Sequence, residues 1–153
     1  MRKFYILVGR VAFVVLLPLL RIYLRGTNRV YLSVIHDGKI ILVKNWLARD
    51  TWRLPGGGIS RGETPKQAVL REAKEELRLI LQESKLVELN TGVMEVDKLR
   101  FNYTNFVYAM DTFPRRLENL YEIVDYGMFD DIPKHAQPIV HDVMNLLKKQ
   151  KLL

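Results

Sequence analysis

The chain has 153 residues, enough for one domain with a substantial core, and its 48% hydrophobic and 27% charged residues are typical of a globular protein. It contains no cysteine, which excludes disulfides and cysteine-ligated metal sites. The net charge of +7 invites a nucleic-acid-binding hypothesis, but six of the 24 basic residues and none of the 17 acidic ones fall within residues 1–30. The rest of the chain is close to neutral, so stable nucleic-acid binding is not expected.

The N-terminal segment is the most apolar part of the chain, because residues 4–24 are interrupted by basic but not by acidic residues. No small-residue cleavage site follows, as a secretory signal would need. Lys3, Arg10 and Arg21 fall on one side of a helical wheel, which favours a helix in the headgroup region of an anionic membrane. Packing against its own domain or a second subunit, as in a homodimer, is an alternative. So is a true membrane span, which would bring Arg10 into the hydrocarbon.

We therefore separate residues 1–27, an apolar and basic helical segment, from a domain over residues 28–153. The expected location is cytoplasmic, either peripheral to a membrane or anchored in it through residues 1–26.

The domain opens with a strand-like pattern. Two β-branched runs, residues 30–35 and 39–43, flank His36-Asp37-Gly38 and predict a β-hairpin. Residues 51–54 predict a short strand. The following Pro55-Gly56-Gly57-Gly58 predicts a connection without regular structure.

A helix is predicted from Pro65 to about Leu81, since Thr64 and Gln67 have capping-box spacing and proline suits the first helical position. Three carboxylates share an arc of about 100° on this helix; they belong to Glu72, Glu75 and Glu76. Apolar residues expected to face the core lie on another side: Val69, Leu70, Ala73, Leu77 and Ile80.

The second half of the domain predicts further strands over residues 86–96, 99–110 and 122–129, and a last helix from about Pro138. Strands, a helix, strands and a helix in this order predict an α/β fold of the α+β type with a mixed or largely antiparallel sheet.

The clustered carboxylates need an explanation, because like charges at this spacing repel by about 0.2–0.5 kcal/mol per pair. One explanation is a solvated helix face on which Arg71 and Arg78 neutralise Glu75. The other is a site for a hard cation such as Mg²⁺, which prefers oxygen ligands. The glycine run favours the second explanation, because a bare backbone can approach a phosphate or offer a carbonyl to a metal.

The spacing of loop and helix resembles the Nudix box, Gly-x5-Glu-x7-Arg-Glu-U-x-Glu-Glu-x-Gly-U, where U is a bulky aliphatic residue. The matching residues are Gly57, Glu63, Arg71, Glu72, Glu75, Glu76 and Leu79. Ala73 is a small aliphatic residue where a larger one is typical, and Arg78 replaces the final glycine. The resemblance implies a Nudix-like mixed sheet sandwiched between helices.

The same resemblance implies a site that binds Mg²⁺, for which Mn²⁺ can substitute, through Glu72, Glu75, Glu76 and the main-chain carbonyl of Gly56. Glu63 and Arg71 are then a structural pair that fixes the loop against the helix. A metal-bound water would attack phosphorus in a nucleoside diphosphate linked to another moiety. The general base stays open between Glu72 and a carboxylate of a later loop, Glu118 or Glu122.

Substrate contacts lie outside the box, and the candidates are Arg53, Trp46, Phe101 and Tyr103. Alternating aromatic residues on a strand are also typical of a core. The competing functional hypothesis is a catalytically silent Nudix-like domain that binds a nucleotide or a protein and is tethered to a membrane by its N-terminal helix.

Overall fold

A computed structural model describes residues 27–46, 50–96, 99–114, 117 and 122–153. The predictions for residues 1–26 and for Glu118 fall outside these residues and stay predictions. In the described part, no helix is long and apolar enough to cross a membrane.

The described chain forms a six-stranded mixed sheet with a helix on each side. Its elements, in chain order, are β1 (Asn28–His36), β2 (Lys39–Asn45), β3 (Gly56–Gly58), α2 (Pro65–Leu77), a 3-10 turn (Glu83–Lys85), β4 (Val87–Val96), β5 (Leu99–Ala109), β6 (Ile123–Phe129) and α3 (Pro138–Lys149). The main strands run in the order β4-β5-β1-β2-β6, and β3 pairs with β1. β1 and β5 are parallel, whereas the other strand pairs are antiparallel. The predicted fold class is confirmed.

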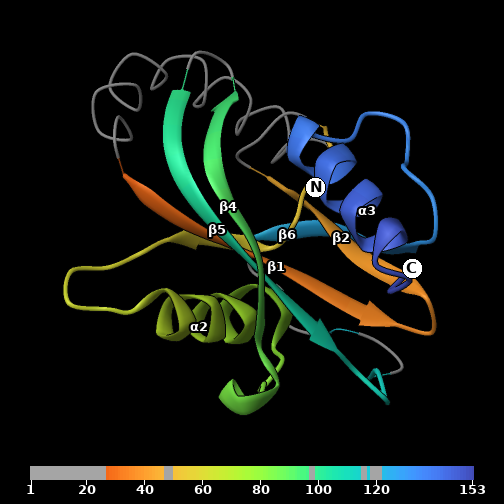
Figure 1. Ribbon diagram of the computed structural model, residues 1–153, viewed down its shortest axis with the longest axis horizontal. Helices are drawn as coiled ribbons and strands as arrows, with labels where there is room; N and C mark the ends of the chain where they lie inside the picture. The colour runs from red at the N-terminus through yellow and green to blue at the C-terminus, as the bar shows by residue number, and fades with distance from the viewer. Residues whose placement is uncertain (1–26, 47–49, 97–98, 115–116, 118–121) are drawn as a thin grey trace.

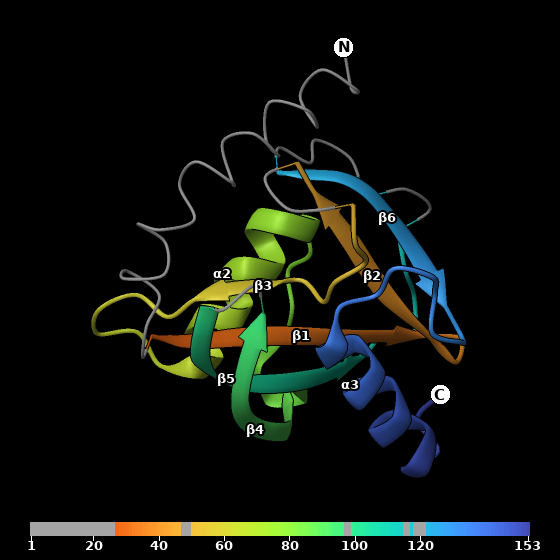
Figure 2. The same ribbon diagram turned by 90° about the horizontal axis from the view of Figure 1, so that it is seen from above.

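Two apolar clusters occupy the two faces of the sheet, because side chains alternate along each strand. Val30, Leu32 and Val34 of β1 belong to the cluster that contains α2. Tyr31 and Ile35 belong to the cluster that contains α3. Figures 1 and 2 show α2 and α3 on opposite sides of the sheet.

The predicted hairpin is confirmed, and its turn has the expected chemistry. Asp37 and Gly38 have φ angles of 48° and 66°, the positive values that a two-residue type I′ turn requires. The start of α2 is also confirmed, since Thr64 and Gln67 exchange both hydrogen bonds of a capping box.

Three local predictions were wrong. Gly56–Gly58 forms the strand β3, because its backbone pairs with residues 29–31 of β1 instead of making an irregular connection. α2 ends at Leu77, not near Leu81, because Arg78 adopts the left-handed conformation with φ 58° and ψ 25°. The chain turns away there, so Ile80 is 89% exposed instead of core, while Leu79 is buried. Residues 51–54 make only isolated bridges, at Trp52 and Arg53.

Arg78→Gly is expected to raise the free energy of unfolding by about 1 kcal/mol, because glycine adopts the left-handed conformation without the Cβ penalty. Urea denaturation of both proteins measures this change. Arg78→Ala is the control, since it removes the arginine side chain but keeps the penalty. An equal gain in the alanine variant would contradict the backbone explanation.

Candidate active site

The glycines of β3 bring the sheet backbone against the carboxylates of α2. Gly56 has a φ of 143°, and a Cβ atom there would overlap the Val30 carbonyl oxygen. A Cβ atom on Gly57 would overlap the carboxylate of Glu72. Glycine at 56 therefore allows β3 to pair with β1, and glycine at 57 leaves room for the Glu72 carboxylate.

Glu76 is the most buried of the helix carboxylates, with 5% of the residue exposed. Its Oε2 accepts a hydrogen bond from the Gly56 backbone N–H at 2.7 Å, and its Oε1 accepts one from Asn45 Nδ2 at 3.3 Å. Burial raises the pKa of Glu76, the positive charge of Arg53 opposes that rise, and the nearby Glu72 carboxylate adds to it. A positively charged ligand would relieve the cost of this desolvated carboxylate.

Arg71 connects the carboxylates of the helix to the loop. Its Nε and Nη2 bind the two oxygens of Glu63, at 2.9 and 3.1 Å, and Nη2 also donates to the Gly58 carbonyl at 2.8 Å. Its Nη1 donates to Glu72 at 2.8 Å and to Glu75 at 3.0 Å. The expected Glu63–Arg71 pair is present, and it is bidentate.

The three helix carboxylates have different surroundings. The side chain of Glu72 is 12% exposed, and burial raises its pKa although Arg71 partly opposes the rise. The side chain of Glu75 is 57% exposed. Glu72 and Glu76 are thus largely shielded from solvent, whereas more than half of the Glu75 side chain is exposed.

The donor chemistry of this site fits a hard divalent cation. Glu76 is bonded to the Gly56 N–H and Glu72 lies beside Gly57, so two desolvated carboxylates and the Gly56 carbonyl offer oxygen near one another. Arg53 Nη2 lies 3.5 Å from the Gly56 carbonyl oxygen, so a positive group already approaches this oxygen. Within the described ranges, no three His, Cys, Asp or Glu side chains are placed to hold an ion by themselves. A cation here would therefore also use backbone, water or substrate oxygens.

Glu122 lies next to the end of β2 that carries the site. Its carbonyl accepts a hydrogen bond from the Trp46 backbone N–H at 3.2 Å, and the following Ile123 pairs with Asn45. The residue is exposed. The structure thus places this candidate base near the end of β2, where Asn45 contacts Glu76.

The aromatic candidates for substrate contact separate in the structure. Phe101 is buried in the cluster on the α3 side, with the Arg29 guanidinium 5.4 Å from its ring centre. Tyr103 is half-buried, and its hydroxyl accepts a hydrogen bond from Asn90 at 3.1 Å. Trp46 is half-exposed at the end of β2. Phe101 therefore has a core position, while Trp46 and Tyr103 keep an accessible part.

Asn45 is a site residue that the sequence reasoning missed. It is the last residue of β2, where the register with β6 shifts: Lys44 pairs with Asp125, and Asn45 pairs with Ile123. No motif in the sequence marks an asparagine at this position. Its role depends on the pairing of β1, β2 and β3, which brings it to Glu76.

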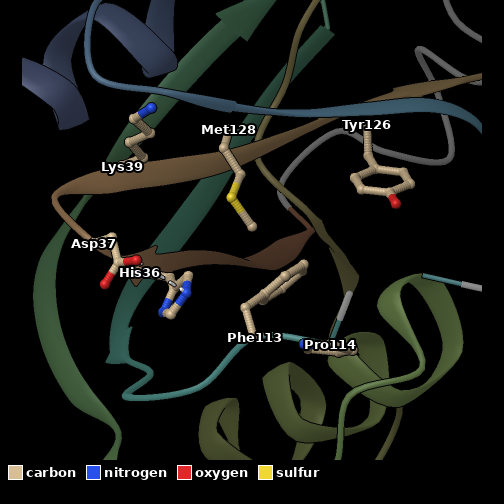
Figure 3. A pocket seen from close by; sticks show the side chains of 7 residues that line it. All are labelled: His36, Asp37, Lys39, Phe113, Pro114, Tyr126 and Met128. Atoms are coloured by element: carbon tan, nitrogen blue, oxygen red, sulfur yellow. Dashed lines mark ion pairs between the residues drawn. The ribbon is translucent and has the colours of Figure 1, made fainter. Parts of the chain in front are cut away.

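A separate hollow of about 440 Å³ lies at the other end of the β1–β2 hairpin (Figure 3). In Figure 3, Phe113 and Met128 point into it and the Lys39 ammonium points away. The lining residues are His36, Asp37, Lys39, Phe113, Pro114, Tyr126 and Met128. None of them belongs to α2 or β3, so this hollow is distinct from the carboxylate site.

Comparison with known proteins shows that most of the chain matches one family model. A family model described as the NUDIX domain matches residues 27–134. An RNA pyrophosphohydrolase from Hydrogenovibrio crunogenus is 49% identical over 43 residues, which cover 28% of this chain and 26% of that protein. Matched stretches span 18% to 35% of the length of the curated relatives.

Solved structures agree in fold. A MutT NUDIX hydrolase from Burkholderia pseudomallei has a TM-score of 0.70 at 21% identity, covering 80% of this chain and 98% of that one. A bifunctional NMN adenylyltransferase/ADP ribose pyrophosphatase from Francisella tularensis, complexed with AMP and a Mn ion, has a TM-score of 0.67 at 18% identity. That match covers 97% of this chain and 47% of that one.

Glu63→Gln is expected to lower the free energy of unfolding at pH 7 by about 1 kcal/mol, because it weakens a partly exposed bidentate pair. Arg71, and then the Ser60 N–H, hold the pKa of Glu63 below its ordinary value. This contribution is complete above the unfolded-state pKa and is lost as pH falls through the lower folded-state pKa. Denaturation at several pH values should therefore show the difference shrinking below about pH 4. A difference that stays constant down to pH 2 would contradict this assignment.

Proposed function

The chain belongs to the Nudix family, and we propose that it is a Mg²⁺-dependent hydrolase that cleaves a phosphoanhydride bond in a nucleotide-derived substrate. The observation that carries the proposal is a pair of carboxylates with little exposure, Glu76 bonded to the Gly56 N–H and Glu72 beside the Gly57 backbone. Burial raises the pKa of both carboxylates although Arg71 and Arg53 oppose the rise, so a further positive group would offset the remaining cost of desolvation. A solvated helix face, the competing explanation, would leave these carboxylates exposed.

The contacts of the carboxylates support a different role for each of them. Both oxygens of Glu76 accept hydrogen bonds from the protein, which orient the carboxylate so that it would hold a cation together with the Gly56 carbonyl. Glu72 has a raised pKa and is oriented by Arg71, which suits it to accept a proton from the attacking water. The cation, when bound, polarises the phosphate and lowers the pKa of water. Glu75 is available as a further ligand.

Arg53 is the residue best placed to contact a substrate phosphate. Its backbone is fixed by two hydrogen bonds with Val43, at 2.9 and 3.0 Å, while its guanidinium lies beside Gly56 and Glu76. The buried Nε has no hydrogen-bond partner in the described structure. An anionic oxygen is the natural partner for such a group.

Chromatographic detection of the cleavage products from a panel of substrates tests the proposal directly. The panel holds nucleoside triphosphates, dinucleoside polyphosphates, ADP-ribose, NADH, and RNA with a 5′ triphosphate or a cap, because curated relatives are RNA pyrophosphohydrolases. Mg²⁺-dependent turnover of one class is expected. Glu76→Gln should reduce it by more than about 100-fold, since the loss of an outer-shell partner alone costs 10–100-fold.

Glu95→Gln, an exposed change on β4, is the matched control and should leave turnover unchanged. Silence of the wild-type protein across the panel would contradict the enzyme proposal and favour a binding domain. Equal turnover in Glu76→Gln would show that the assigned carboxylates are not the site.

Gly57→Ala is expected to reduce turnover by about 100-fold, because the new methyl group must displace the Glu72 carboxylate by about 1 Å or more. Gly58→Ala is the matched control, since a Cβ atom there meets nothing within 4 Å. Steady-state kinetics of the two variants on the substrate found above measure the effect. Equal losses in both, or none in Gly57→Ala, would contradict the role given to Glu72.

A further inference from the structure

We propose that Asn45 is a positioning residue of the cation site: its Nδ2 fixes Glu76, and its Oδ1 faces the divalent cation or a water bound to it. The inference rests on the proposed function, because it concerns the same site. Asn45 lies outside the sequence stretch from Gly57 to Leu79 that carries the family pattern.

The amide donates to Glu76 from the strand side. Asn45 Nδ2 lies 3.3 Å from Glu76 Oε1, while the Gly56 N–H holds Oε2 at 2.7 Å. The carboxylate is thus held from β2 and from β3 at once, and its orientation is fixed. The opposite amide orientation would bring two oxygen atoms together, so the donor assignment follows from the contact itself.

The other atom of the same amide has no partner. Asn45 Oδ1 is buried and accepts no hydrogen bond in the described structure. A buried acceptor without a donor costs about 1–3 kcal/mol, so such an atom needs a partner. Beside a site built from carboxylate and carbonyl oxygens, the fitting partner is a hard cation or the water that it carries.

The backbone explains why the side chain reaches the site. The register between β2 and β6 shifts between Lys44 and Asn45, and Asn45 then pairs with Ile123. Alternation along β2 places Ile41 and Val43, and therefore Asn45, on the face of the sheet that packs against α2.

The affinity of the substrate-free protein for Mn²⁺, measured by electron paramagnetic resonance, tests the inference without relying on turnover. Asn45→Ala is expected to weaken Mn²⁺ binding by about ten-fold, as the loss of an outer-shell partner does. Asn45→Asp loses the donor but keeps an oxygen that faces the cation. It should therefore bind Mn²⁺ at least as tightly as wild type, while melting at a lower temperature without metal because two carboxylates then face each other. Asn145→Ala, an exposed change on α3, is the matched control.

The same assay on Glu76→Gln separates the two proposals. Loss of Mn²⁺ binding in Glu76→Gln with wild-type affinity in Asn45→Ala would overturn the role of Asn45 and leave the metal site in place. Unchanged affinity in both variants would overturn the metal site and the inference with it. Weakened binding in Asn45→Asp equal to that in Asn45→Ala would overturn the assignment of Oδ1 to the cation.

Discussion

The hydrogen bond from the Gly56 N–H to the buried Glu76 carboxylate joins the sheet to the helix, and the candidate site depends on it. A carboxylate with 5% exposure needs donors on both oxygens, and the protein supplies them from β3 and from Asn45. This arrangement keeps a negative charge inside the protein at a defined place. It also explains two of the three glycines of β3, because a Cβ atom at Gly56 would overlap the Val30 carbonyl oxygen of β1 and one at Gly57 would overlap the Glu72 carboxylate of α2.

Arg71 joins the helix to the loop that precedes it. One guanidinium binds Glu63, Glu72, Glu75 and the Gly58 carbonyl, so the loop before α2 and two of the helix carboxylates share one cation. The positive charge offsets the repulsion that clustered glutamates would otherwise produce. Because Arg71 engages Glu75 and Glu72 but not Glu76, the three carboxylates of one helix have three different environments.

Sequence reasoning predicted the parts of the fold that local chemistry decides. The Asp37-Gly38 turn, the Thr64 cap and the Glu63–Arg71 spacing each follow from neighbours in the chain, and all are present. Pairing between distant segments decided the rest. The strand at Gly56–Gly58 depends on β1, and the hydrogen bond from Asn45 depends on the register of β2. The end of α2 was mispredicted because Arg78 adopts the left-handed conformation that usually marks a helix end when glycine occupies it. An arginine at this position gives no such indication in the sequence.

The central claim is that Glu76 and the Gly56 carbonyl, with Glu72 beside them, form a divalent-cation site. A crystal structure of the full chain grown with Mn²⁺, with anomalous diffraction data, tests it most directly. The account predicts an anomalous peak within coordination distance of Glu76 and of the Gly56 carbonyl oxygen, with Arg53 moved away from that oxygen. Mn²⁺ found only elsewhere, with Arg53 still beside Gly56, would contradict it.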